Sequence, residues 1–269
     1  MSLLLQISDP HFGTERPAVV EALVALAQRE RPDLVVLSGD ITQRARPEQF
    51  RDARAFADRL GAPLVAIPGN HDIPLLDLPA RLFHPYARHA AAFGAELEPV
   101  HASPDLLVIC VNTTRPWQHK NGVVSAAQIA RVALLLAAAT PAQLRVVVVH
   151  QPAAVPRPQD AHDLLRGHAE ALRQWAEAGA DVVMGGHIHL PYVIEQRGLA
   201  RPLWVVQAGT AVSSRVREGV PNSVNLLRWN GGTGAREALV EQWDGDAAGG
   251  AFTRRAVTRL VPARGGDGH

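Results

Sequence analysis

The sequence predicts a layered α/β fold with two sheets inside one domain. Short apolar runs alternate with amphipathic helical stretches along most of the chain. The last third instead contains strand-like runs separated by glycine-rich turns, a pattern that favours antiparallel pairing. With 269 residues, the chain is long enough to bury a large core. We therefore predict a single domain over residues 1–263 and a disordered tail over 264–269.

The first elements alternate strictly between strand and helix. Strands are expected at 3–7, 34–37 and 64–67, and helices at 17–30 and 47–60. Pro17 and Pro47 suit the first turn of a helix. Val20, Leu23 and Val24 recur at helical spacing, which gives the first helix one apolar face. This β-α-β-α-β order predicts buried strands covered by helices.

The centre of the chain interrupts this alternation and then resumes it. Residues 73–100 hold several prolines and scattered aromatics, which predicts an insertion of short helices and loops over one end of a sheet. Ser125, with Gln128 three residues later, forms the pattern of a capping box. Beyond the insertion, strands are expected at 106–111, 145–149 and 181–184, and helices at 125–139 and 162–178.

The final strand-like runs lie at 203–207, 223–229, 237–243 and 252–260. We expect these runs to form a second, more antiparallel sheet. No linker separates them from the preceding residues, so we assign them to the same domain.

Composition and charge exclude several classes of protein. The net charge of +1 gives no general signal for nucleic-acid binding. The single cysteine, Cys110, excludes an intramolecular disulfide framework. No stretch is apolar and long enough to span a membrane, and the first residues lack the pattern of a secretory signal. We therefore expect a cytoplasmic monomer or homodimer without a membrane anchor.

Five of the apolar runs end in polar residues of similar chemistry. In chain order, these residues are Asp9 and His11, Asp40, Asn70 with His71 and Asp72, His150, and His187 with His189. Sites in layered α/β proteins gather at the carboxyl ends of strands, so these ends can face one cleft. Glycines within the motifs allow sharp turns and close approach of the backbone.

These side chains form a set of oxygen and imidazole metal ligands without a thiolate. Such donors favour Mn²⁺, Fe²⁺ or Fe³⁺, Zn²⁺ or Co²⁺ over Ca²⁺ and Mg²⁺. Taken alone, each motif also fits a turn, a cap or a satisfied histidine. Their recurrence after five strands favours a site for two ions that share a carboxylate. The candidate ligands are Asp9, His11, Asp40, Asn70, His150, His187 and His189.

The motifs resemble the signature of the calcineurin-like metallophosphoesterases. The signature occurs in order as Asp9-x-His11, Gly39-Asp40, Gly69-Asn70-His71-Asp72, His150 and Gly186-His187-x-His189. The spacing is most similar to that of class III cyclic nucleotide phosphodiesterases and glycerophosphodiester phosphodiesterases. The resemblance implies a four-layer α-β-β-α sandwich, in which two mixed sheets are flanked by helices.

The resemblance also implies how the ligands divide between the two metal ions. One ion would be held by Asp9, His11 and His189. The other would be held by Asn70, His150 and His187. Asp40 would bridge the two ions.

Two further residues of the third motif receive roles close to the reaction. By resemblance, His71 is not a ligand but approaches the phosphate and the leaving oxygen, as a proton donor or an electrostatic stabiliser. For Asp72 two interpretations stay open, because this carboxylate would either orient His71 or cap the next turn.

The polar loop after strand 106–111 is a candidate substrate-binding segment. Trp117 would stack on a base, and Arg115 or His119 would contact phosphate. A simple solvated loop is the alternative. Further along the chain, Arg215 and Arg217 are interpreted as part of a subunit contact. The candidate substrate-binding residues are Asn112, Arg115, Trp117 and His119.

These features predict hydrolysis of a small phosphodiester, with a 3′,5′-cyclic nucleotide as one candidate. Two metal ions would lower the pKa of a shared water and supply a bridging hydroxide for in-line attack on phosphorus. Alternatives at the same site are a phosphomonoesterase and a hydrolase of nucleotide pyrophosphate bonds. An alternative of another class is a non-catalytic metal-binding scaffold for a protein partner. The complete ligand set, together with His71, argues against the scaffold.

Overall fold

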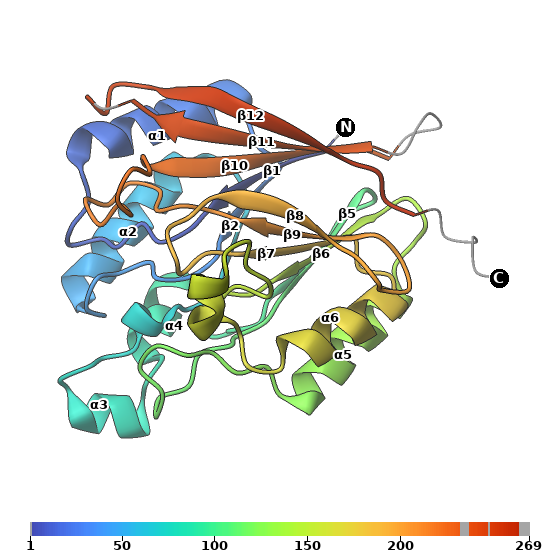
Figure 1. Cartoon of the computed structure of the whole chain (residues 1–269). Helices are drawn as coiled ribbons and strands as arrows, with labels where there is room; N and C mark the ends of the chain where they lie inside the picture. The colour runs from blue at the N-terminus through green and yellow to red at the C-terminus, as the bar shows by residue number, and fades with distance from the viewer. Residues whose placement is uncertain (1, 232–236, 247, 264–269) are drawn as a thin grey trace.

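Two six-stranded sheets pack face to face, and helices cover both outer sides (Figure 1). The computed structural model describes residues 2–231, 237–246 and 248–263. The tail predicted over 264–269 lies outside the described residues. The arrangement confirms the predicted α-β-β-α sandwich of two mixed sheets.

The first sheet is built around the N-terminal strands. Its order is β12 (Phe252–Leu260), β11 (Glu237–Gly245), β10 (Ser223–Asn230), β1 (Ser2–Ile7), β2 (Leu34–Leu37) and β3 (Leu64–Ala66). The pairs β1–β2 and β2–β3 are parallel, whereas β10, β11 and β12 are joined by antiparallel pairs. The carboxyl ends of β1, β2 and β3 therefore lie at one edge of this sheet.

The second sheet has a parallel centre and two antiparallel edges. Its order is β4 (Val100–Ala102), β5 (Leu106–Cys110), β6 (Leu144–Val148), β7 (Val182–Gly185), β9 (Leu203–Gln207) and β8 (Tyr192–Gln196). The four central strands are parallel, and β4 and β8 run against them. The carboxyl ends of β6, β7 and β9 meet at a common edge.

The structure corrects the prediction that the strands in the last third of the chain form a second, separate sheet. These strands do not form a sheet of their own, because β9 joins the second sheet and β10 pairs with β1 in the first. The reason is visible in β10, where Leu226 packs toward the helices and Leu227 packs between the sheets. A strand buried on both faces occupies the middle of a sheet. The short edge strand β8, only partly buried, was not predicted.

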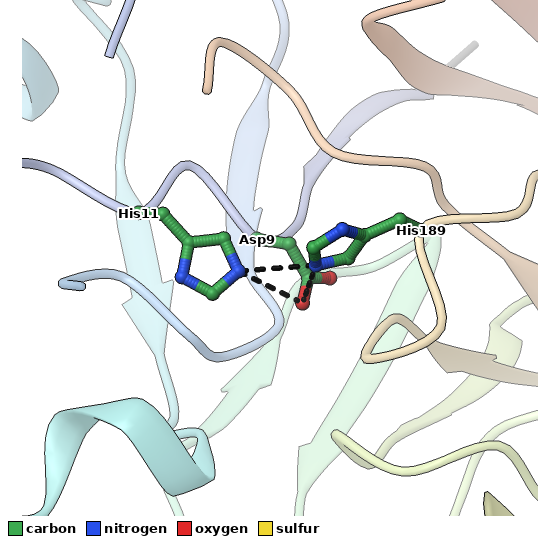
Figure 2. Close-up of side chains that lie close together, drawn as sticks. All are labelled: Asp9, His11 and His189. Carbon is green, nitrogen blue, oxygen red and sulfur yellow. Dashed lines mark hydrogen bonds and ion pairs between the residues drawn. The ribbon is translucent and has the colours of Figure 1, made fainter. Parts of the chain in front are cut away.

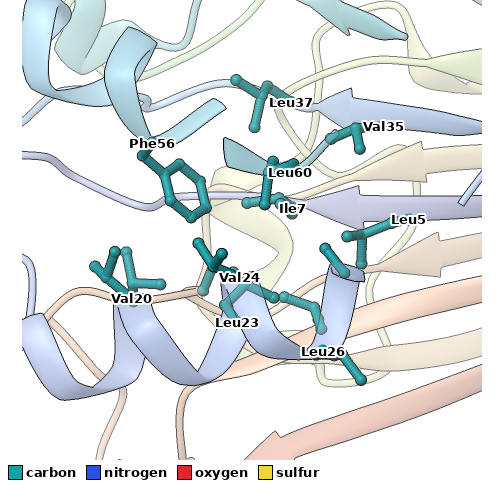
Figure 3. Close-up of a cluster of buried hydrophobic side chains, with 14 of the residues drawn as sticks. Leu5, Ile7, Val20, Leu23, Val24, Leu26, Val35, Leu37, Phe56 and Leu60 are labelled. Atoms are coloured by element: carbon teal, nitrogen blue, oxygen red, sulfur yellow. The ribbon is translucent and has the colours of Figure 1, made fainter. Parts of the chain in front are cut away.

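Three apolar layers hold the sandwich together. The outer helices are α1 (Pro17–Glu30), α2 (Pro47–Arg59), α5 (Ala126–Ala137) and α6 (His168–Glu177). In the first layer, Leu5 of β1 and Leu23 of α1 belong to one cluster (Figure 3). Leu4 lies on the other face of β1, in the layer between the sheets. The third layer joins Val147 of β6 to Trp175 of α6.

The helix boundaries follow local signals with one exception. Helices α1 and α2 begin at their prolines, and the hydroxyl of Ser125 caps α5 by accepting a hydrogen bond from the Gln128 amide. Helix α6 begins at His168 and not at 162, because Gly167 has a φ of 88° that a continuous helix cannot include. Residues Pro158–Asp163 form the separate 3₁₀ turn η2.

The segment 73–100 contains α3 (Leu78–Phe83) and α4 (Ala87–Phe93). Helix α3 buries none of its residues, whereas Phe93 at the end of α4 packs against the first apolar layer. Among the described residues, no helix is both long and apolar enough to cross a membrane.

Candidate metal centre

The polar residues that follow five strands come together at the carboxyl edges of the two sheets. Asp9 and His11 follow β1, and Asp40 follows β2. His150 follows β6, and His187 and His189 follow β7. Three groups of three form here. Two are Asp9 with His11 and His189, and Asp40 with His150 and His187; the third joins Asp40 and His11 to His71, which follows β3. Within each group the ligand atoms all lie within 4.8 Å of one another.

The first group converges on one point from two strands of different sheets (Figure 2). Asp9 Oδ1 lies 3.3 Å from His189 Nε2 and 3.8 Å from His11 Nε2. The two Nε2 atoms lie 3.0 Å apart. The backbone carbonyl of Arg215 accepts a hydrogen bond of 2.6 Å from His189 Nδ1, so the other ring nitrogen is directed at the site.

Asp40 lies between the two groups. Its Oδ2 is 3.9 Å from His11 Nε2, and its Oδ1 is 3.3 Å from His150 Nε2. His150 Nδ1 donates to the carbonyl of Ser38 at 2.8 Å, which leaves its Nε2 facing Asp40. This placement of one carboxylate, with one oxygen toward each group, is the geometry that a bridging ligand requires.

Several buried atoms of the centre have no hydrogen-bond partner. They are Asp9 Oδ1, Asn70 Oδ1, His150 Nε2 and both ring nitrogens of His187. Leaving such atoms unpaired is costly, so native proteins satisfy them with protein, water or ions. All are oxygen or imidazole donors. The residues present therefore fit two transition-metal ions.

Burial and neighbouring charges favour the cation-binding form of Asp9, His11 and His187, and the protonated form of His150. Burial raises the pKa of Asp9, but the ion pair with His189 outweighs burial and lowers the pKa to about 2. Burial lowers the pKa of His11 to about 3 and that of His187 to about 4. Burial also lowers the pKa of His150, whereas the charge of Asp40 dominates and raises it to about 9. A cation would displace that proton from His150.

The backbone is strained at most of the candidate ligands. Outside glycine, positive φ angles are uncommon and energetically unfavourable. Here they occur at Asp9 (51°), His11 (44°), Asp40 (49°), His187 (74°) and His189 (53°). Such outliers persist only where the surrounding structure enforces them, and they cluster at functional sites.

Gly69 lets the turn after β3 pass directly over Asp40. A Cβ atom on Gly69 would overlap the Asp40 amide nitrogen and its Oδ1. Backbone cannot move aside as a flexible side chain can. Gly69→Ala is therefore expected to displace Asp40 and reduce bound metal by about one ion per chain, as measured by elemental analysis. Gly250→Ala is the control, because the nearest atom to its added Cβ is 3.5 Å away. Full metal content in Gly69→Ala would contradict this role.

His71 lies beside the first group, and a backbone carbonyl holds its ring at Nδ1. The backbone carbonyl of Gln43 accepts a hydrogen bond of 2.9 Å from His71 Nδ1. The centroids of the His71 and His11 rings are 4.9 Å apart. A ligand atom of His71 also lies within 4.8 Å of those of His11 and Asp40, so its spacing is compatible with metal binding as well.

The hydrogen bonds of Asp72 favour the capping interpretation of its role. Its carboxylate accepts hydrogen bonds from the amides of Ile41 (2.9 Å), Thr42 (2.7 Å) and Gly69 (2.8 Å). Asp72 therefore ties the loop after β2 to the turn η1 (Asn70–Asp72), as a cap does. Burial, reinforced by the charge of Asp40, raises the pKa of Asp72 to about 6.

The loop after β5 separates into a structural part and a part near the site. Asn112 and Arg115 form hydrogen bonds within the loop, and their assignment to substrate stays a prediction. The guanidinium of Arg115 binds the carbonyls of Asn112 and Thr114 at 3.0 and 2.7 Å. His119 does reach the site, because its ring centroid lies 6.3 Å from that of His71. Trp117 is 77% exposed and packs against little of the protein.

Arg215 and Gln43 were not predicted as site residues. The guanidinium of Arg215 lies 3.2 Å from His71 Nε2 and 2.9 Å from Gln43 Oε1, which places it at the site. Arg217 instead pairs with Asp160 at 2.8 Å. Strand β9 pairs in parallel with β7, so the loop after β9, which carries Arg215, reaches the same edge as His187. Knowledge of this pairing would have identified Arg215 as a site residue.

Comparison with known proteins agrees with this geometry. The profile of the calcineurin-like phosphoesterases matches residues 3–191, a range that includes all of the candidate ligands. The chain belongs to the calcineurin-like phosphoesterase family. This confirms the family that the motifs resemble.

Two curated relatives share part of their length with this phosphoesterase. A cAMP/cGMP dual specificity phosphodiesterase from Mycobacterium tuberculosis is 29% identical over 204 residues, which cover 70% of this chain and 61% of that protein. The glycerophosphodiester phosphodiesterase GpdQ from Enterobacter lignolyticus is 43% identical over 83 residues, which cover 26% of this chain and 29% of that protein. Both matches span less than two thirds of the relative.

Solved structures share the fold at low sequence identity. A dimetal phosphatase from Danio rerio superposes with a TM-score of 0.65 at 13% identity, over 97% of this chain and 99% of that one. This likeness supports the two-sheet sandwich of the phosphoesterase.

Proposed function

We propose that this phosphoesterase hydrolyses a small phosphodiester with the help of two metal ions. The observation that carries the proposal is the pair of donor groups that share Asp40 between them. When bound, two ions activate water for attack on phosphorus and neutralise charge on its oxygens. Asp9, His11 and His189 would hold one ion. Asn70, His150 and His187 would hold the other, with Asp40 common to both.

His71 is proposed to act on the leaving group. Its Nδ1 is held by the carbonyl of Gln43, so Nε2 is the atom available on the side of the centre. A proton on Nε2 would pass to the leaving alkoxide oxygen as the ester bond breaks. The chain then needs no serine or cysteine nucleophile, and the single cysteine, Cys110, is fully buried in β5.

A cyclic nucleotide is the proposed substrate, and the names of the relatives support a diester. The test is a comparison of bis(p-nitrophenyl) phosphate, p-nitrophenyl phosphate and cyclic AMP, using protein reloaded with Mn²⁺ and analysed for metal. Faster cleavage of the diesters, cyclic AMP included, is the expected result. Preference for the monoester would support a phosphatase instead. Two bound ions without turnover of any of the three would favour the scaffold.

Trp117 is proposed to stack on the base of such a nucleotide. Its side chain is exposed, and the same loop places His119 next to His71. Trp117→Ala is expected to raise the KM for cyclic AMP about tenfold, in line with the usual strength of base stacking. The affinity for inorganic phosphate should not change. Leu134→Ala, which removes another exposed apolar side chain on α5, is the control. An unchanged KM would leave Trp117 outside the substrate site.

We also propose, from the sequence, that the protein is cytoplasmic and is a monomer or a homodimer.

A further inference from the structure

Arg215 places a cation against the rings of the candidate metal centre. Its Nη1 lies 2.9 Å from Gln43 Oε1, 3.2 Å from His71 Nε2 and 3.4 Å from His11 Nδ1. The side chain is partly buried, and its backbone carbonyl receives the hydrogen bond from His189. Arg215 is thereby fixed at both its backbone and its side chain.

No carboxylate neutralises this guanidinium within the described part of the chain. Arg217, two residues later, illustrates the difference, because its guanidinium pairs with Asp160 at 2.8 Å. Arg115 illustrates a second arrangement, in which the guanidinium binds two backbone carbonyls and the Gln128 side chain. Within the described residues, the one oxygen acceptor of Arg215 is the neutral side-chain amide of Gln43. A partly buried, unpaired cation of this kind is suited to an incoming anion.

The free donors of Arg215 match the oxygens of a phosphate. Its contacts with other side chains in the described residues all use Nη1. Nη2 and Nε therefore keep N–H groups for a ligand. A guanidinium presents these groups as a planar fork, and that fork fits two phosphate oxygens better than an ammonium does.

We propose that Arg215 binds non-bridging oxygens of the substrate's phosphate beside the metal ligands. The side-chain oxygen of Gln43 holds the guanidinium in place for this contact. The inference rests on the proposed function, because it assigns Arg215 to the same phosphate on which hydrolysis occurs. In the transition state, where negative charge on these oxygens increases, the same contact becomes stronger.

The test compares Arg215→Gln, Arg215→Lys and the control Arg217→Gln in Mn²⁺-loaded protein. Metal content is measured by elemental analysis, and the affinity for inorganic phosphate by titration calorimetry. Arg215→Gln is expected to keep its metal and to bind phosphate about tenfold more weakly or worse, the usual effect of losing a charged hydrogen bond. Arg215→Lys should fall between the wild type and Arg215→Gln, because it retains the charge and loses the fork. Arg217→Gln should bind phosphate as the wild type does.

Two results would overturn the inference. Unchanged phosphate affinity in Arg215→Gln would show that the guanidinium does not contact the anion. Loss of metal in that variant would mean that Arg215 acts by positioning His189 and not by binding phosphate. Neither result depends on turnover. Failure of the wild type to cleave any diester would instead count against the proposed function, while phosphate affinity would still decide the role of Arg215.

Discussion

Asp40→Ala is expected to reduce bound metal from two ions to one or none and to abolish diester hydrolysis. Among the described residues, Asp40 is the one carboxylate that faces both donor groups, so its loss would remove a ligand from each ion at once. Its Oδ1 also accepts the amide of His71 at 2.8 Å, so the turn after β3 loses an anchor as well. Metal content and kcat for bis(p-nitrophenyl) phosphate are the measurements.

Asp52→Ala is the matched control for this experiment. Asp52 is an exposed carboxylate on α2, and its partner is the neighbouring Arg51. This variant should keep both ions and full turnover. If Asp40→Ala also retained two ions and normal turnover, the two-metal arrangement would be wrong.

His71→Ala is expected to keep both metal ions and to lower kcat by about 10²–10⁴, the range that general acid catalysis contributes. The loss should be smallest for diesters with good leaving groups, because p-nitrophenolate needs little protonation as it departs. Comparing bis(p-nitrophenyl) phosphate with cyclic AMP measures this difference.

His84→Ala is the control for His71→Ala, since His84 is exposed at the end of α3. Loss of one ion in His71→Ala would reassign His71 as a ligand, a role that its proximity to His11 and Asp40 permits. An equal loss of kcat for all diesters would favour electrostatic stabilisation over proton donation.

The elements that the sequence predicted well are those defined by local signals. Helix α1 begins at Pro17 and ends at Glu30, as its apolar spacing and its proline indicate. The candidate ligands were recognisable for a similar reason, because each lies within a few residues of the carboxyl end of a short strand. Once the strands are known to be parallel, their carboxyl ends, and the ligands beyond them, are expected at the same edge of the sheet.

The features that the sequence did not predict depend on contacts between distant segments. Strand β10 pairs with β1, more than two hundred residues away in the sequence. The residues of β10 do not by themselves indicate which strand it pairs with. The role of Arg215 follows from β9 lying beside β7, which is again a long-range pairing. Arg115 has the chemistry of a phosphate ligand, and only its contacts within the loop show where its donors are used.

The left-handed conformations at the candidate ligands link metal supply to the lifetime of the protein. Each strained residue costs about 1–3 kcal/mol of folding free energy, a large share of the total for a typical domain. Ions that bind only the folded chain would offset this cost in proportion to their concentration. A chain made during metal starvation would then unfold more often and meet proteases sooner. The abundance of the protein would therefore follow the cell's supply of the metal that it uses.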